Sequence, residues 1–225
     1  MRKTEFAVGE FYHIFNRGVD KRNLFQDGED FERFFKSMTE FNTIDPIGSI
    51  YEKDQERTKF GKFGSRASKL LDRVVDTKLV DFVAYCINPN HYHFLLMQKI
   101  DKGVEKFMHR FGTGYTKFFN IKHERSGALF QGKFKASHAH TNEYLLHLSA
   151  YVNLNYLVHG LSAENIFVRS SFGEYKVGTE GFCSKAIILG QYGDSKQYSE
   201  FAQNSVALTQ ARRRSDKEFS KALLE

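Results

Sequence analysis

Residues 79–97 read LVDFVAYCINPNHYHFLLM, and this stretch decides the fold. Two runs rich in β-branched and aromatic residues, 79–87 and 91–97, flank the sequence NPN at 88–90. Asparagine and proline suit the dihedral angles of a tight turn, and the flanking residue types suit strands. The stretch therefore predicts a β-hairpin.

The segments on either side of the hairpin complete a split βαβ pattern. Before it, residues 11–17 predict a strand, and Asp27 is placed to cap a helix whose apolar residues recur at helical spacing. After it, we expect a helix over 104–119, a strand over 128–137, and a helix from Thr141 to about residue 158. This order predicts an α+β, ferredoxin-like antiparallel sheet with helices packed on one face, plus a further helix.

The chain divides into two predicted parts. Residues 1–160 form one domain, with an insertion at about 43–78 that proline and glycine punctuate and that holds a predicted short helix over 65–76. Residues 161–225 form a C-terminal extension in which the hydrophobic pattern fades and only part of the chain is expected to be helical.

The composition is that of a globular, basic protein. Of the 225 residues, 41 % are hydrophobic and 27 % are charged, and the net charge is +6. No apolar run reaches the roughly 18–20 residues that a membrane-spanning helix needs. Two cysteines make neither a disulfide scaffold nor a zinc-finger ligand set, so a cytoplasmic location is expected.

The basic residues are concentrated in one stretch. Residues 99–140 contain nine basic and three acidic side chains, an excess as large as that of the whole chain. Such a concentration is typical of a nucleic-acid-binding surface, although a solvated helix face produces the same pattern.

Two histidines of the hairpin form a candidate metal site. Side chains alternate along a strand, so His91 and His93 leave one face and Tyr92 leaves the other. Two neighbouring neutral imidazoles can hold a divalent metal ion. A His-x-His pair in an aromatic strand is also frequent as a purely structural feature, so both interpretations stay open for the pair alone.

The final helix carries a candidate nucleophile. Tyr151 and Asn155 lie four residues apart and share one helix face with His147. An amide oxygen of Asn155 could complete a three-ligand site with the histidines, and the phenol of Tyr151 could reach an electrophile there. In the alternative interpretation Tyr151 packs against the core and Asn155 caps the helix.

Taken together, these motifs make the chain resemble the HUH single-strand DNA transposases with one catalytic tyrosine, and within them the REP-associated tyrosine transposases. The resemblance covers roughly residues 8–160, and the segment with Asn-Pro-Asn-His-x-His is its most specific part. The matching stretches are YHIFNRG (12–18), YCINPNHYH (85–93), SGALFQGKFK (126–135) and YVNLN (151–155), with a weaker echo in SSFGEY (170–175).

The resemblance implies a role for each matching position. His91, His93 and Asn155 would be the metal ligands, with Mg²⁺ or Mn²⁺ as the cofactor, and Tyr151 would be the nucleophile. A 5′-phosphotyrosine link to DNA and a free 3′ hydroxyl would result. The chain departs from the family pattern at Tyr156, where a proline is common, and this change is expected to lengthen the helix.

Tyr115 is a rival nucleophile within the basic stretch. It lies on the apolar stripe of the predicted 104–119 helix, which favours a core position over a catalytic one. The predicted DNA-binding residues are basic side chains, for which an ordinary solvated surface is the competing interpretation. They are Arg17, Lys117, Arg125, Lys133 and Lys135, the last two expected on one face of the same strand.

The sequence thus predicts a metal-dependent transposase that binds, nicks and rejoins single-stranded DNA. Hairpin-forming single-stranded DNA is the expected partner, and a nucleoid-associated position in the cytoplasm is the expected location. The same sheet topology also serves non-catalytic single-stranded nucleic-acid-binding modules, and a metal-dependent hydrolase without a covalent tyrosine is a third alternative. The oligomeric state stays open between a monomer and a homodimer.

Overall fold

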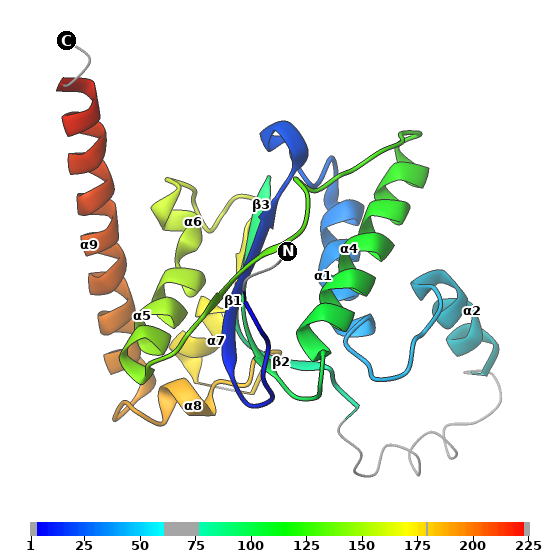
Figure 1. The fold of residues 1–225 in the computed structure, drawn as a ribbon, viewed down its shortest axis with the longest axis horizontal. Coiled ribbons are helices and arrows are strands. Elements are labelled where there is room, and N and C mark those ends of the chain that lie inside the picture. Colours follow the sequence, from blue (N-terminus) through cyan, green and yellow to red (C-terminus); the bar gives the residue numbers. More distant parts are fainter. Residues whose placement is uncertain (1–3, 61–76, 179, 223–225) are drawn as a thin grey trace.

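The fold is built on one antiparallel sheet with helices on both faces (Figure 1). The computed structural model describes residues 4–60, 77–178 and 180–222. The strands are β1 (Phe11–Arg17), β2 (Val80–Asn88), β3 (His91–Gln98), β4 (Lys135–His138) and β5 (Arg169–Ser170). The helices are α1 (Gly28–Glu40), α2 (Ile50–Phe60), α4 (Gly103–Lys122), α5 (Asn142–Asn153), α6 (Asn155–Val158), α7 (Phe172–Val177), α8 (Ala186–Leu189) and α9 (Ser195–Ala222), with a 3₁₀ turn at Val19–Lys21.

The strand order is β4-β1-β3-β2-β5, and every neighbouring pair is antiparallel. The first four strands follow the ferredoxin-like order, so the α+β fold expected from the sequence is confirmed, with α1 and α4 on one face and the helices from α5 onward on the other. The two-residue strand β5 comes from the C-terminal extension and adds to the free edge of β2. The hairpin register pairs Asn88 with His91, which leaves Pro89 and Asn90 as the turn.

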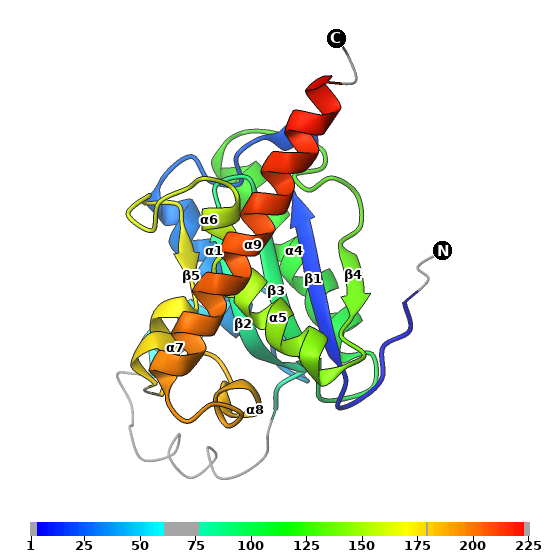
Figure 2. The same ribbon diagram turned by 90° about the vertical axis from the view of Figure 1, so that its left-hand side faces the viewer.

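Two hydrophobic clusters hold the layers together, one on each face of the sheet. The first lies between the sheet and helices α1 and α4, and its centre is aromatic, with Phe34, Phe94 and Phe111 fully buried. The second lies between the sheet and helices α5 to α9 (Figure 2). The helices of the C-terminal extension therefore cover the face that carries α5, whereas Phe167, Phe182 and Cys183 of the extension pack into the first cluster.

The helix ends follow the sequence signals. The side chain of Asp27 accepts a hydrogen bond from the backbone N–H of Asp30 at 3.0 Å, and that of Thr141 accepts one from Tyr144 at 3.1 Å. Each satisfies a backbone donor that the first helical turn leaves unpaired. After α6, Gly160 adopts a left-handed φ of 70°, a conformation that glycine reaches without steric cost.

The structure corrects two predicted element boundaries. The strand expected over 128–137 is β4 only, because Gly127 and Gly132 adopt positive φ and break the extended backbone before Lys135. The helix expected to run to residue 158 is interrupted at Leu154 (φ −112°, ψ 21°) and resumes as α6. Tyr156, where the family pattern has a proline, is thus followed by only two further helical residues, Leu157 and Val158.

The insertion is helical in a place that the sequence did not suggest. Helix α2 packs beside α1 through ion pairs from Lys53 and Arg57 to Glu40, each at 2.7 Å. The charged residues of α2 alternate in sign along the chain, and the segment has little hydrophobic periodicity. The sequence pattern therefore predicts no helix there. The short helix expected over 65–76 lies outside the described residues. None of the described helices has the length and apolarity to cross a membrane.

Candidate active site

The two hairpin histidines share one face of β3, as their spacing predicts. The rings of His91 and His93 lie 5.3 Å apart between centroids and nearly perpendicular to each other. Tyr92 points to the opposite face, where it is buried in the aromatic cluster below α4. The alternation of the strand thus separates a polar site from the apolar core.

Hydrogen bonds determine which nitrogen of His91 carries its proton. The side-chain oxygen of Asn90 lies 2.7 Å from Nδ1 of His91, and a carbonyl oxygen can only accept, so Nδ1 donates. The amide nitrogen of Asn88, a donor, lies 3.0 Å from Nε2 on the other side of the ring. Nε2 thus lies between a donor, the amide of Asn88, and an acceptor, the oxygen of Asn155, and it faces the site as a metal-binding histidine nitrogen would.

Asn155 reaches the same point from the other side. Its side-chain oxygen lies 3.2 Å from Nε2 of His91 and accepts a 3.0 Å hydrogen bond from the amide of Asn88. The residue is fully buried, and its own amide nitrogen has no hydrogen-bond partner among the described residues. The amide of Asn88 thus donates to two acceptors that converge on one point, an arrangement that equally suits a cation.

His93 is held by a histidine that the sequence analysis did not single out. Nε2 of His13, on the adjacent strand β1, lies 2.7 Å from Nδ1 of His93. Burial lowers the pKa of His13 to about 4, so this ring is neutral at neutral pH and one ring donates to the other. When His93 donates from Nδ1, its Nε2 keeps a lone pair for a ligand role.

Tyr151 lies beside these histidines. Its ring, on α5, meets the ring of His93 edge to face at 5.7 Å and that of His13 at 5.9 Å between centroids. Tyr151 is half-buried and lines an open cavity. The rival Tyr115 is fully buried on the other side of the sheet, where its hydroxyl donates a 2.6 Å hydrogen bond to the carbonyl of Leu24 and burial raises its pKa. Its packing makes Tyr115 a core residue.

A third histidine belongs to the cluster and was missed from the sequence. The ligand nitrogens of His91, His93 and His159 all lie within 4.8 Å of one another, and the rings of His91 and His159 are 4.3 Å apart. His159 follows α6 and lies four residues after Asn155. The four-residue spacing is visible in the sequence, but His159 is at the end of the predicted helix, where the pattern does not show which way its side chain points.

The donor set fits a divalent metal ion. It offers imidazole nitrogens from two or three histidines and one amide oxygen, all neutral, with partners such as Asn90 and His13 behind the ligands. Imidazole suits zinc, iron and similar transition metals, whereas an amide oxygen also suits magnesium and manganese. Two residues lie close enough to His91 to be the third metal ligand. They are Asn155, which the sequence predicts in this role, and His159.

The predicted DNA-binding residues lie on different surfaces. In the sheet register Arg17 stands opposite His91, and Lys135 stands opposite Phe15, which in turn stands opposite His93. Directly paired residues point to the same face, so Arg17 and Lys135 lie on the face of the candidate site. Arg17 there donates a hydrogen bond to the side chain of Gln131.

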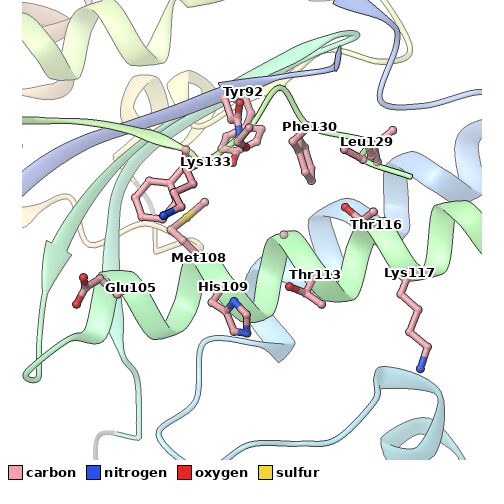
Figure 3. A pocket seen from close by; sticks show the side chains of 15 residues that line it. Tyr92, Glu105, Met108, His109, Thr113, Thr116, Lys117, Leu129, Phe130 and Lys133 are labelled. Atoms are coloured by element: carbon pink, nitrogen blue, oxygen red, sulfur yellow. The ribbon is translucent and has the colours of Figure 1, made fainter. Parts of the chain in front are cut away.

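The remaining three basic residues lie elsewhere. Lys133 is in the bend before β4 and not on a strand face with Lys135, because Gly132 turns the chain. With Lys117 it lines a cavity of about 840 Å³ between α4 and the 128–134 segment; Figure 3 shows Lys133 reaching toward α4, whereas Lys117 points away from Phe130. Arg125 donates to Asn120 and to a backbone carbonyl, so it shapes its own loop.

Two comparisons with known proteins identify relatives. The family described as "Transposase IS200 like" matches residues 51–155. A solved structure of a REP-associated tyrosine transposase bound to a REP hairpin has a similar fold, with a TM-score of 0.51 and 12 % sequence identity. The alignment covers 87 % of this chain and 92 % of that chain. No curated protein matches the chain.

Proposed function

We propose that this chain, an IS200-like transposase by the family match over residues 51–155, binds, nicks and rejoins single-stranded DNA through a 5′-phosphotyrosine intermediate at Tyr151. The observation that carries the proposal is the meeting of three elements at one point. Strand β3 supplies His91 and His93, α5 supplies a tyrosine ring 5.7 Å from His93, and α6 supplies the oxygen of Asn155 3.2 Å from His91. We expect a hairpin-forming strand as the substrate, as in the REP hairpin complex of the structural relative.

In the proposed reaction the phenol oxygen of Tyr151 attacks the scissile phosphorus in line. The bond between tyrosine oxygen and phosphorus forms, the bond from phosphorus to the 3′ oxygen breaks, and the phenol proton is lost as the 3′ hydroxyl is released. The new ester conserves the energy of the phosphodiester, so a free 3′ hydroxyl can reverse the step without a nucleotide cofactor.

Three neutral side chains would hold the divalent metal ion, namely His91, His93 and Asn155. The ion, Mg²⁺ or Mn²⁺, would neutralise charge on the scissile phosphate and polarise phosphorus for attack. The protein's own contribution is orientation: Asn90 holds the His91 lone pair toward the site, and His13 fixes the ring of His93. Three neutral ligands would leave the charge of the ion available to the phosphate.

Basic residues near the site would bind the DNA backbone. Arg17 and Lys135 lie on the face of the histidines and are exposed, so we assign them to the strand that enters the site. Lys117 and Lys133 flank the cavity on the opposite face, and there they would hold a more distant part of the substrate. We assign the catalytic domain to residues 1–160, with 161–225 as an extension that completes the second face.

Covalent trapping tests the proposal. The protein, Mn²⁺ and single strands from the DNA beside its own gene, labelled at the 3′ end that the 5′-phosphotyrosine adduct would retain, are incubated and separated under denaturing conditions. A labelled protein band that disappears in Tyr151→Phe but survives in Tyr115→Phe supports a tyrosine transposase. Cleavage without a labelled protein band would contradict a tyrosine transposase and indicate a metal-dependent hydrolase. Intact strands with tight binding would leave only a non-catalytic binding module.

A further inference from the structure

The open cavity that Tyr151 lines lies between α5 and the C-terminal helix α9. Its volume is about 510 Å³. On one wall are His13, His147 and Tyr151. The opposite wall comes from α9, where Ser205, Thr209 and Arg212 recur at intervals of four and three residues and so share one helix face.

Side-chain contacts fix α9 in this position. Nδ1 of His147 lies 3.0 Å from the hydroxyl of Ser205, and the side chain of Gln210 donates a 2.6 Å hydrogen bond to the carbonyl of Leu157. Figure 2 shows α9 crossing over α5 and continuing past α6, and Arg212 of α9 lines the same cavity as Tyr151 and His13. The extension is therefore positioned to contribute to that site.

The chemistry of the cavity suits an anion. No aspartate or glutamate occurs among the described residues that line it, and its polar groups are hydroxyls, imidazoles and one guanidinium. Arg212 is exposed and makes no hydrogen bond or ion pair with another described residue. A guanidinium beside hydroxyl and imidazole groups, with no carboxylate among the described lining residues, is a preferred partner of phosphate.

We propose that this cavity binds a phosphodiester group of the DNA strand adjacent to the bond that Tyr151 attacks, with Arg212 as its cationic contact. The inference rests on the proposed function, because it takes single-stranded DNA as the substrate and Tyr151 as the nucleophile. It gives the C-terminal extension a direct part in substrate binding.

Methylphosphonate scanning of the DNA tests the contact. Each phosphate of a hairpin-bearing strand from beside the gene is replaced in turn by an uncharged methylphosphonate, and affinity is measured in a Tyr151→Phe background that leaves the strand uncut. We expect one or two consecutive positions to weaken binding by roughly threefold to tenfold, the range of a charge-assisted hydrogen bond in contact with solvent.

The variant R212Q should weaken binding of the unmodified strand by the same factor and abolish the further effect of those methylphosphonates. Arg212→Lys, which keeps a cation at this position, should keep part of the affinity and part of the methylphosphonate effect. The matched control is Lys196→Gln, an exposed cation of α9 that does not line the cavity and should keep the pattern of the background protein. Circular dichroism melting checks that each variant is folded.

An unchanged methylphosphonate pattern in R212Q would overturn the inference. This test is independent of the test of the proposed function. Covalent trapping with Tyr151 intact tests the strand-transfer reaction, and the R212Q comparison tests the phosphate site. A trapped adduct without coupling at Arg212 refutes only the phosphate site. Coupling without any adduct leaves the phosphate site standing and refutes the strand-transfer reaction.

Discussion

Replacing Asn90 by alanine should weaken metal binding although Asn90 is not a proposed ligand. In the structure its side-chain oxygen accepts the Nδ1 proton of His91 at 2.7 Å and so directs the Nε2 lone pair into the site. Without that acceptor, His91 can take the other tautomer or turn, and each ligand-competent arrangement is less populated. The variant also loses a 3.2 Å hydrogen bond to the carbonyl of Lys21, so its melting temperature must be compared with that of the parent.

The expected magnitude follows from the position of the residue. Removing a hydrogen-bond partner of a metal-bound histidine costs 10- to 100-fold in metal affinity, which is about 1.4–2.7 kcal/mol. Asn90 is half-buried, so water can replace part of the lost interaction, and we expect the lower end, about tenfold.

Titration of the apo protein with Mn²⁺, followed by electron paramagnetic resonance of the free ion, measures this affinity. Asn90→Asp keeps an acceptor and should bind Mn²⁺ at least as well as the parent. Asn142→Ala, which removes an exposed asparagine side chain paired with Gln191 at the start of α5, is the matched control and should be unchanged. Equal affinity of Asn90→Ala and the parent would refute the assigned tautomer and with it the orientation of the site.

Three further outcomes are expected. Asn155→Ala should reduce Mn²⁺ affinity more than His159→Ala, as read by the same titration, and the reverse order would make the exposed histidine the third ligand. Tyr115→Phe should keep cleavage activity but lower the free energy of unfolding by about 1–3 kcal/mol in denaturant titration, because a buried backbone carbonyl loses its donor. Changing Lys133 and Lys135 together to alanine should reduce the slope of log affinity against log salt by about one to one and a half units. A slope unchanged in the double variant would show that neither lysine contacts phosphate.

The parts of the fold that local sequence determines were predictable. The β2–β3 hairpin, β1 and α4 follow from residue types, turn signals and helical periodicity within each segment. The same periodicity set Tyr115 on the core side of α4. The pairing of His91 with His93 likewise needs only the alternation of a strand.

Features that depend on distant segments were not predictable in the same way. His13 meets His93 only because β1 pairs with β3, and no local pattern records that contact. Arg212 reaches the neighbourhood of Tyr151 only through the packing of α9 on α5. The limits of β4 were missed because Gly132 bends a segment whose residue types alone suit an extended strand.

The measurement that tests the central claim most directly is the location of the nucleotide on the protein. The covalent adduct is digested with nuclease and protease, and the peptide that keeps a nucleotide remnant is sequenced by mass spectrometry. The account predicts the remnant on Tyr151, attached through a 5′ phosphate. A remnant on any other tyrosine, or a cleaved strand with no modified peptide, would contradict it.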